Sequence, residues 1–161
     1  MRLVLNSTQD VNSQNLALLR RNMGKQNIVV LVHANWCYHC QMFKPAWDQF
    51  CAANASTPGL LLVELENSVM ASLAQHDQST YMFLARDIEG FPTVYMYRTG
   101  AQERVPFNKE RSVTGLSSFV KENAAKVPAK SAKPAAAKPA ATAKKPATKT
   151  PKKVAKSKKT I

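Results

Sequence analysis

Two cysteines separated by two residues, Cys37 and Cys40, mark the point where an apolar run meets a predicted helix. The run, residues 28–32, consists of Ile, Val and Leu and is typical of a strand that is buried on both faces. A cysteine at the N-terminus of a helix lies near unpaired backbone N–H groups and the positive end of the helix dipole, which favour its thiolate. Cys37 is therefore the predicted nucleophile, and Cys40, one turn later, can attack the mixed disulfide that Cys37 forms.

A pair with this spacing can also be half of a zinc site, which needs two further ligands, or it can be two inert thiols. The other candidate ligands are Cys51, His33, His39 and His76, and they form no second Cys-x-x-Cys and no His-x-x-x-His. A pair at a strand-to-helix junction is typical of dithiol–disulfide chemistry. The sequence therefore favours a redox pair, with no metal and no bound cofactor.

The chain divides in two by composition. Residues 1–125 carry eleven Lys and Arg against ten Asp and Glu, whereas residues 126–161 hold twelve Lys, five Pro and ten Ala without any acid, aromatic residue or Gly. Nearly all of the formal net charge of +13 thus belongs to the second part. The first part is long enough for one domain with one core. The second cannot bury enough apolar surface to offset its ordering entropy, so we expect it to be disordered when free.

Apolar periodicity and turn residues predict an alternation of strands and helices in residues 1–125. Pro45 is expected to kink the helix that follows the cysteines, because its nitrogen donates no hydrogen bond. Two helices are expected within residues 67–90, which makes this connection between strands unusually long. The added length could serve as a docking surface or as a spacer. Strands are expected at residues 3–5, 27–34, 60–66, 93–98 and 104–107, and helices at 13–23, 37–53, 68–74, 80–86 and after 112.

The motif Trp-Cys-Tyr-His-Cys at residues 36–40, followed by Pro45, resembles the active site of the thioredoxin superfamily. The histidine before its second cysteine is similar to the protein disulfide isomerase version of the motif. Gly-Phe-Pro-Thr at residues 90–93 resembles a second family element, in which the proline bond is cis and faces the cysteines; the alternative is an ordinary loop proline. The resemblance implies an α/β thioredoxin fold, a central mixed β-sheet flanked by helices on both faces.

The resemblance also implies roles for individual residues. Cys37 attacks the substrate and Cys40 resolves the mixed disulfide. His39 is expected to stabilise the first thiolate, and Arg111 to swing toward the second cysteine and lower its pKa. Either tuning residue could instead be a solvated surface side chain. The expected contacts with a protein thiol or disulfide substrate, whose extended backbone pairs beside the proline, come from Trp36, Tyr38, Phe91 and Pro92.

Several positions depart from the family pattern. Leu31 stands where the family carries a buried acid that shuttles a proton to the second cysteine, so we expect slower proton transfer at Cys40 and less efficient turnover. His33, which replaces a usual aromatic residue, either substitutes in part for that acid or is a core or rim histidine. Tyr38 replaces a glycine and is expected to narrow access to the attacked sulfur. Cys51 is expected to be a buried, inert thiol.

The basic tail, residues 126–161, repeats Ala-Lys-Pro and Lys-Lys-Pro and resembles the tails of linker histones and of some viral basic proteins. Lysines without aromatic residues attract phosphates but do not recognise particular bases. The expected partner is therefore nucleic acid of any sequence or an acidic protein surface. Nuclear import signals and a merely solubilising tail are the alternatives. The lysines expected to bind the polyanion are Lys133, Lys138, Lys144, Lys145, Lys149, Lys152 and Lys153.

The sequence predicts neither a signal peptide nor a membrane span, because the N-terminus soon turns polar and no run of about 18 apolar residues occurs. The expected location is the cytoplasm or the nucleus, or a virion. The favoured function is a thiol–disulfide oxidoreductase that its tail anchors to a polyanion. The alternatives are a structural thioredoxin-like component of a nucleoprotein particle or virion capsid, and a histone-like compacting protein that needs only the tail.

Overall fold

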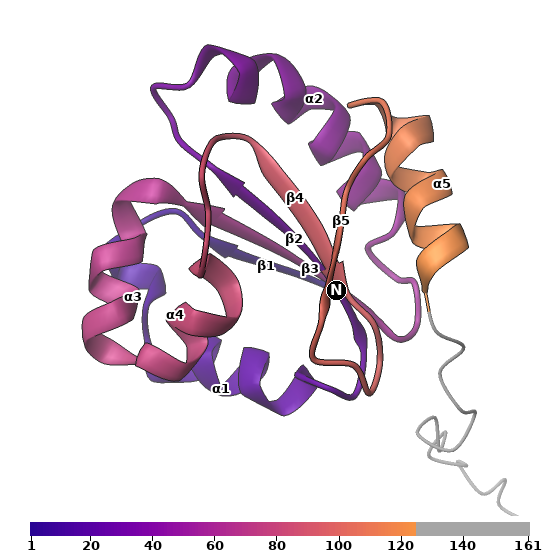
Figure 1. Ribbon diagram of the computed structural model, residues 1–161. Helices are drawn as coiled ribbons and strands as arrows, with labels where there is room; N and C mark the ends of the chain where they lie inside the picture. The colour runs from indigo at the N-terminus through magenta and orange to yellow at the C-terminus, as the bar shows by residue number, and fades with distance from the viewer. Residues whose placement is uncertain (125–161) are drawn as a thin grey trace, which may run out of the picture. The chain divides into compact units, whose positions relative to one another are not determined.

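A mixed five-stranded β-sheet forms the centre of the fold (Figure 1). The computed structural model describes residues 1–124, and within them the strands lie in the order β1-β3-β2-β4-β5. β3 pairs in parallel with β1 and β2, whereas β4 runs antiparallel to both β2 and β5. The predicted α/β fold with a central mixed sheet is confirmed. The strands are β1 (Arg2–Leu5), β2 (Asn27–His33), β3 (Leu60–Glu66), β4 (Thr93–Tyr97) and β5 (Arg104–Pro106).

Helices cover both faces of this sheet (Figure 1). On one face lie α1 (Ser13–Asn22), α3 (Met70–His76) and α4 (Gln78–Ala85), and on the other α2 (Tyr38–Ala53) and α5 (Val113–Asn123). Two short 3-10 turns, η1 (Thr8–Asp10) and η2 (Asn67–Val69), precede α1 and α3. Every residue of β2 and β3 is buried, because helices cover these two strands from both sides.

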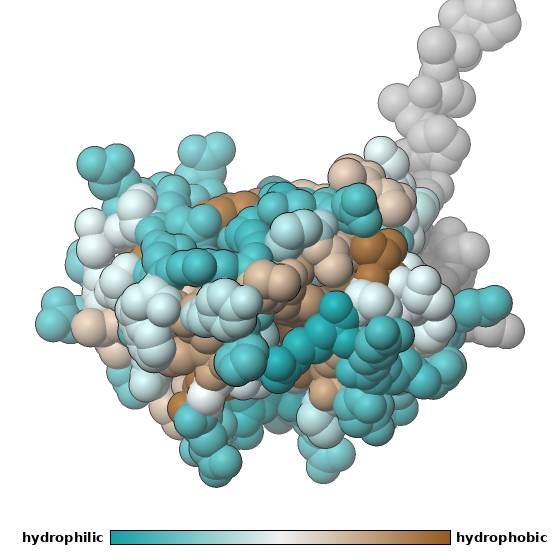
Figure 2. Space-filling model, turned by 90° about the horizontal axis from the view of Figure 1, so that it is seen from above, coloured by the Kyte–Doolittle hydropathy of each residue, from teal (hydrophilic) through white to brown (hydrophobic). Residues whose placement is uncertain are grey.

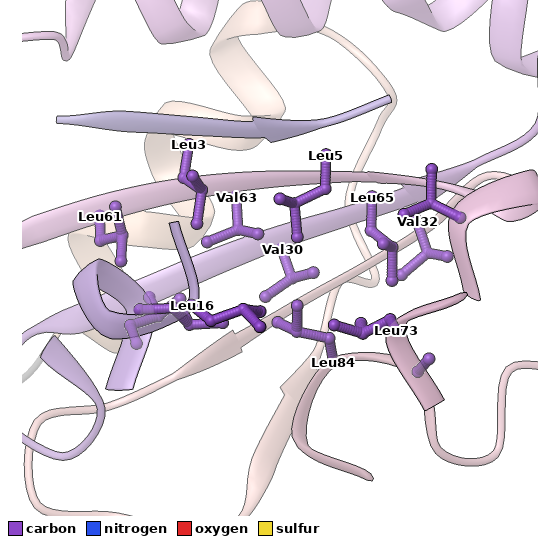
Figure 3. Close-up of a cluster of buried hydrophobic side chains, with 14 of the residues drawn as sticks. Leu3, Leu5, Leu16, Val30, Val32, Leu61, Val63, Leu65, Leu73 and Leu84 are labelled. Carbon is purple, nitrogen blue, oxygen red and sulfur yellow. The ribbon is translucent and has the colours of Figure 1, made fainter. Parts of the chain in front are cut away.

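Alternate residues of the central strands build two cores, one on each side of the sheet. Val30 and Val32 of β2 point into the first core, toward α1, α3 and α4, and Figure 3 shows how Leu16, Leu73 and Leu84 meet them there. The second core lies under α2 and α5. It contains Val29, Leu31, Leu60, Leu62, Phe43, Trp47, Phe50, Cys51, Val94, Met96, Leu116 and Phe119.

The segment 67–90 forms two helices, as the sequence predicts, with Asp77 between them. Asp77 ends α3 and caps α4, since its Oδ1 accepts a hydrogen bond from the backbone N–H of Thr80 at 3.1 Å. Its Oδ2 also accepts from Nε of Arg20 on α1 at 2.9 Å. Leu73 and Leu84 are fully buried in the first core. The added length of this segment is thus taken up by helices that cover the sheet.

No helix among residues 1–124 has the length and apolar character needed to cross a membrane. α2 continues through Pro45 to Ala53, which places both motif cysteines and Cys51 on or next to one helix. The proposed boundary at residues 125 and 126 and the basic tail lie outside the described residues.

Candidate active site

Cys37 is the N-cap of α2, at the carboxyl end of the buried strand β2. Its Sγ accepts a hydrogen bond from the backbone N–H of Cys40 at 3.2 Å, and its own N–H donates to the carbonyl oxygen of Ala34 at 3.1 Å. A sulfur in this position receives partial positive charge from the first turn of the helix. The local sequence produces this geometry because the apolar run ends at the sheet edge and the helix begins immediately afterwards.

Cys40 lies inside the first turn of α2 and is buried. Burial raises the pKa of its thiol to about 11, and the hydrogen bond with Cys37 adds to this effect. The backbone at Ala34 and the positive charge of Arg111 act in the opposite direction. Both cysteines are free thiols in this structure. The pair therefore combines a sulfur at a helix N-terminus with a second thiol that is hard to deprotonate.

The Phe91–Pro92 peptide bond is cis and lies against the cysteine pair. Cys37 Sγ is 3.6 Å from the carbonyl oxygen of Phe91. Phe91 also packs on the small cluster formed by Ala34 and the two cysteines. Segments far apart in the sequence thus meet here, because β2 ends and antiparallel β4 begins at the same edge of the sheet.

Large apolar side chains are exposed around the cysteines. The exposed fraction is 73% for Trp36, 68% for Tyr38 and 65% for Met42. The Trp36 ring meets the Phe91 ring edge-on, with centroids 5.9 Å apart. Viewed from above, apolar residues in brown and tan reach the surface among hydrophilic residues (Figure 2). The rim of the site therefore offers apolar contact area next to Cys37, and Tyr38 and Met42 stand one turn apart on α2.

The two predicted tuning residues differ in how they relate to the thiols. Arg111, in the exposed loop before α5, lowers the pKa of Cys40 through its charge. His39 is also exposed, and its ring packs against the Tyr38 ring at 5.9 Å between centroids. Within residues 1–124, His39 forms no hydrogen bond with either sulfur. Arg111 thus acts on Cys40 through its charge alone, whereas the His39 ring packs against Tyr38.

A buried acid that the sequence did not reveal lies beneath α2. Leu31 is buried among apolar residues, as expected, but Glu64 of β3 is its register partner and is fully buried. Glu64 Oε2 accepts hydrogen bonds from Arg2 of β1 and, at 3.2 Å, from Nε1 of Trp47. Lys44 of α2 completes the cationic surroundings, with Nζ 3.3 Å from Glu64 Oε1. One carboxylate thus joins β1, α2 and β3.

His33, at the end of β2, belongs to the same buried cluster. Its Nε2 lies 3.1 Å from Glu64 Oε1, and its side chain is almost fully buried. Burial acts to raise the pKa of Glu64, but the contacts with His33, Arg2 and Lys44 hold that pKa well below its ordinary value. Glu64 therefore stays a carboxylate at neutral pH. Of the two predictions for His33, the structure places it in the core, against a carboxylate from the neighbouring strand.

A second buried acid, Glu66, supports the loop that leads to the cysteines. Its Oε1 accepts from the backbone N–H of Asn35 at 3.1 Å, and its Oε2 accepts from the backbone N–H of Ser68 at 2.8 Å and from the Ser68 hydroxyl. These bonds keep the pKa of Glu66 low against the effect of burial. Glu66 thereby fixes the residue immediately before Trp36. In the sequence, both glutamates look like the polar end of a strand, and no pattern predicts that they are buried.

Cys51 is buried, and burial raises the pKa of its thiol to about 11. No group of three or more His, Cys, Asp or Glu side chains among residues 1–124 is arranged to hold a metal ion. The predicted polyanion-binding lysines, from Lys133 to Lys153, lie outside the described residues.

Comparison with known proteins yields one family match and many relatives. The family model described as Thioredoxin matches residues 9–122. Protein disulfide-isomerase erp38 of Neurospora crassa is 28% identical over 101 residues, which are 63% of this chain and 26% of the relative. Protein disulfide-isomerase of Saccharomyces cerevisiae is 30% identical over 104 residues, 63% of this chain and 18% of the relative. The chain thus spans about a quarter or less of these relatives.

Solved structures with the same fold include the first thioredoxin domain of mouse Protein disulfide-isomerase A4, with a TM-score of 0.52 and 19% identity over 83% of this chain and 86% of that one. Human ERp44 has a TM-score of 0.50 and 18% identity over 69% of this chain and 31% of that one. At these identities the likeness concerns the fold, and the predicted thioredoxin fold is confirmed.

Proposed function

This chain belongs to the thioredoxin family, and from that premise we propose that it is a thiol–disulfide oxidoreductase of the protein disulfide isomerase kind that acts on protein substrates. The observation that carries the proposal is the hydrogen bond from the Cys40 backbone N–H to Cys37 Sγ at the start of α2. A backbone N–H that points at a sulfur at the N-terminus of a helix is what nucleophilic exchange at this cysteine requires.

The exchange proceeds in two displacements. The Cys37 thiolate attacks one sulfur of a substrate disulfide; a bond between Cys37 and that sulfur forms, and the other substrate sulfur leaves as a thiolate that takes up a proton. The Cys40 thiolate then attacks Cys37 Sγ, so that the Cys37–Cys40 disulfide forms and the bound substrate sulfur leaves. The substrate gains two electrons and the protein loses them. The reverse sequence oxidises a substrate dithiol.

Deprotonation of Cys40 is the demanding step in this scheme. A thiol with a pKa of about 11 is almost fully protonated at neutral pH, and Leu31, at the position where the family carries a buried acid, offers no proton acceptor. The positive charge of Arg111 eases that deprotonation. We therefore propose that Arg111 assists the resolving step and that turnover is slow where the resolving step limits the rate.

Substrate binding is proposed to use the exposed rim. Trp36 and Tyr38 offer apolar contact, while the backbone at Phe91 can pair with an extended segment beside the cis bond to Pro92. The substrate cysteine would then reach Cys37 Sγ from the solvent side. This arrangement accounts for a protein, rather than a small thiol, as the substrate class.

The test is reduction of insulin disulfides and reactivation of a scrambled disulfide protein by the full chain, compared with Cys37→Ser, Cys40→Ser and Cys51→Ser. We expect Cys37→Ser to abolish both activities, Cys40→Ser to accumulate mixed disulfides, and Cys51→Ser to retain activity. The proposal is wrong if the wild-type protein catalyses neither reaction and Cys40→Ser traps no partner.

The tail adds a proposal that rests on sequence alone: residues 126–161 anchor the domain to nucleic acid or to an acidic protein surface, in the cytoplasm, the nucleus or a virion. About eight phosphate contacts on duplex DNA would give a log–log salt dependence with a slope near −7. A chain ending at residue 125 should lose that binding. Unchanged binding by the shortened chain would exclude the tail as the anchor.

A structural role in a nucleoprotein particle or virion capsid is the second candidate, and it is favoured by Leu31 and by the exposed Tyr38 beside Cys37. Both features reduce catalytic efficiency without weakening the fold. Reduction of many protein disulfides by each molecule of this protein would support the enzyme. Incorporation of this protein into a particle in a fixed, high copy number, with less than one disulfide reduced per molecule, would support the structural role. Loss of all function on deleting residues 126–161, with dispensable cysteines, would instead support a histone-like protein.

A further inference from the structure

A pocket of about 440 Å³ opens at the end of the sheet that lies away from the cysteines. Its walls come from the turn after α1, from α4, from the end of β4 and from the turn between β4 and β5. Tyr97, in one wall, pairs with Ile28 at the start of β2, whereas Cys37 follows the end of that strand. Figure 1 shows the β4–β5 turn at the opposite end of the sheet from the start of α2. The pocket is therefore separate from the cysteine pair, and its volume is within the range of small-molecule sites, roughly 300–1,000 Å³.

The rim of this pocket is fixed by backbone contacts between two turns. Gly100, in the β4–β5 turn, donates its N–H to the carbonyl oxygen of Gly24, which follows α1, at 2.9 Å. The N–H of Thr99 donates to Oδ1 of Asn27 at 3.1 Å. Both glycines have a positive φ, 72° for Gly24 and 76° for Gly100, a conformation that glycine adopts without strain. The two turns are therefore joined directly, and the rim is in place before any ligand binds.

One wall of the pocket is aromatic. The rings of Phe83 on α4 and Tyr97 on β4 stack with their centroids 4.0 Å apart and their planes 16° apart. The Tyr97 hydroxyl donates to the carbonyl oxygen of Phe83 at 2.7 Å. The Tyr95 hydroxyl donates to the carbonyl oxygen of Leu84, and together these bonds hold the last turn of α4 on the sheet. Met82, which is 41% exposed, also lines the pocket. Flat rings and an adaptable thioether suit a planar apolar group.

Among the residues 1–124 that line the pocket, only Arg86 carries a charge. Its Nε lies 3.2 Å from Asp87 Oδ2, and its carbonyl oxygen accepts from Nη1 of Arg104 at 2.6 Å. Nη2 of Arg104 lies 3.6 Å from the same Asp87 oxygen, so two guanidinium groups share one carboxylate. Within residues 1–124, Nη1 and Nη2 of Arg86 form no hydrogen bond or ion pair. The local excess of positive charge and the unused edge of this guanidinium both favour an anionic group.

We propose that the pocket binds a small planar aromatic molecule that carries one carboxylate. Its ring lies against Phe83 and Met82, and its carboxylate accepts from both Nη atoms of Arg86, which a planar guanidinium presents side by side. The side chains of Ser79 and Gln102 line the same pocket and form no hydrogen bond within residues 1–124, so they can serve further polar groups of the ligand. The fixed rim lowers the cost of binding. This site goes beyond disulfide exchange and needs neither cysteine.

The test uses cinnamate and its neutral analogue cinnamyl alcohol, each titrated into the isotope-labelled full-length protein and followed by NMR of the backbone amides. We expect cinnamate to shift the amides of Gly100, Ala101 and Gln102 saturably and to bind about tenfold more tightly than the alcohol. Arg86→Met should abolish this difference. Arg21→Met is the control, because Arg21 is exposed on α1 outside the pocket and should leave both affinities unchanged.

A second variant tests the volume of the pocket independently of its charge. Ser79→Trp places a large ring at an exposed position of α4 that lines the pocket, and it should weaken the binding of both probes by about tenfold. Equal affinity of the wild-type protein for the two probes, or equal losses in Arg86→Met and Arg21→Met, would overturn the inference. Amide shifts confined to the surroundings of Trp36 and Tyr38, or unchanged binding by Ser79→Trp, would overturn it as well.

Discussion

Glu64 of β3 is the register partner of Leu31 of β2, so the buried carboxylate of this domain lies one strand away from the position where family resemblance would place an acid. The shift changes the environment of that carboxylate. Arg2, Lys44 and His33 surround it and keep its pKa low. A carboxylate held this firmly in its ionised form stabilises the fold but is a poor carrier of protons.

Removal of the charge at Glu64 should destabilise the domain strongly. Glu64→Gln leaves Arg2 and Lys44, each partly exposed, facing a neutral amide, and the loss of these charged hydrogen bonds should cost about 1.5–3 kcal/mol. Urea unfolding of the purified protein measures this loss. Asp48→Asn is the matched control, because Asp48 binds the same two cations on the exposed side and should cost about 1 kcal/mol or less. Equal losses in both variants would contradict the buried role.

Acid should weaken the fold through the same residue. The pKa of Glu64 is lower in the folded state than in the unfolded chain, where it is about 4.3. Its contribution is therefore complete above that value and is lost as the pH falls toward the folded-state pKa. Glu66 and Asp77 have lowered pKa values and act with the same sign. Urea unfolding at pH 7, 4 and 3 should show a falling free energy of unfolding, with a weaker dependence in Glu64→Gln.

The loop before the cysteines should loosen when Glu66 loses its carboxylate. Glu66→Ala removes the acceptor for the Asn35 and Ser68 backbone N–H groups, and the loss of such partly buried hydrogen bonds costs about 1 kcal/mol each. Hydrogen exchange at the Asn35 amide should accelerate, and insulin reduction should slow because Trp36 and Cys37 follow directly. Ser68→Ala, which keeps the bond to Asn35, is the control. Unchanged protection at Asn35 would show that other contacts hold the loop.

Tyr38 should limit access of large substrates to Cys37. Its ring is mostly exposed beside the attacking sulfur, so Tyr38→Ala should change stability by about 0.5 kcal/mol or less. We expect faster reduction of a folded protein disulfide and an almost unchanged rate with a small aromatic disulfide, measured side by side. Met42→Ala, one turn further along α2, is the comparison. A slower reaction of Tyr38→Ala with protein substrates would mean that the apolar contact of the ring with the substrate outweighs its obstruction of Cys37.

Most strands and helices follow from the sequence, because residues 28–32 and 60–63 are unbroken apolar runs and the N-cap side chains of α1, α2, α4 and α5 each accept a hydrogen bond from the first turn. The contact between Cys37 and Phe91 is harder to foresee, since it depends on the antiparallel pairing of β2 with β4; only the motif resemblance pointed to it. The burial of Glu64 and Glu66 is not predictable from the sequence, because a carboxylate near a strand end is usually solvated. Their burial depends on cations and N–H groups that other elements bring, and no local pattern encodes that.

The helical segment from η2 to α4 connects the end of β3 to the loop that contains Pro92. The cysteines and the cis bond lie at the ends of two other strands, the neighbouring β2 and β4. Neither α3 nor α4 forms a hydrogen bond with the cysteine pair within residues 1–124, although Tyr95 and Tyr97 of β4 donate to carbonyl oxygens of α4. Substitutions at exposed positions of α3 and α4 should therefore leave the chemistry intact, so the outer surface of this segment is free to diversify, and to acquire new recognition roles, without retuning the sulfur pair.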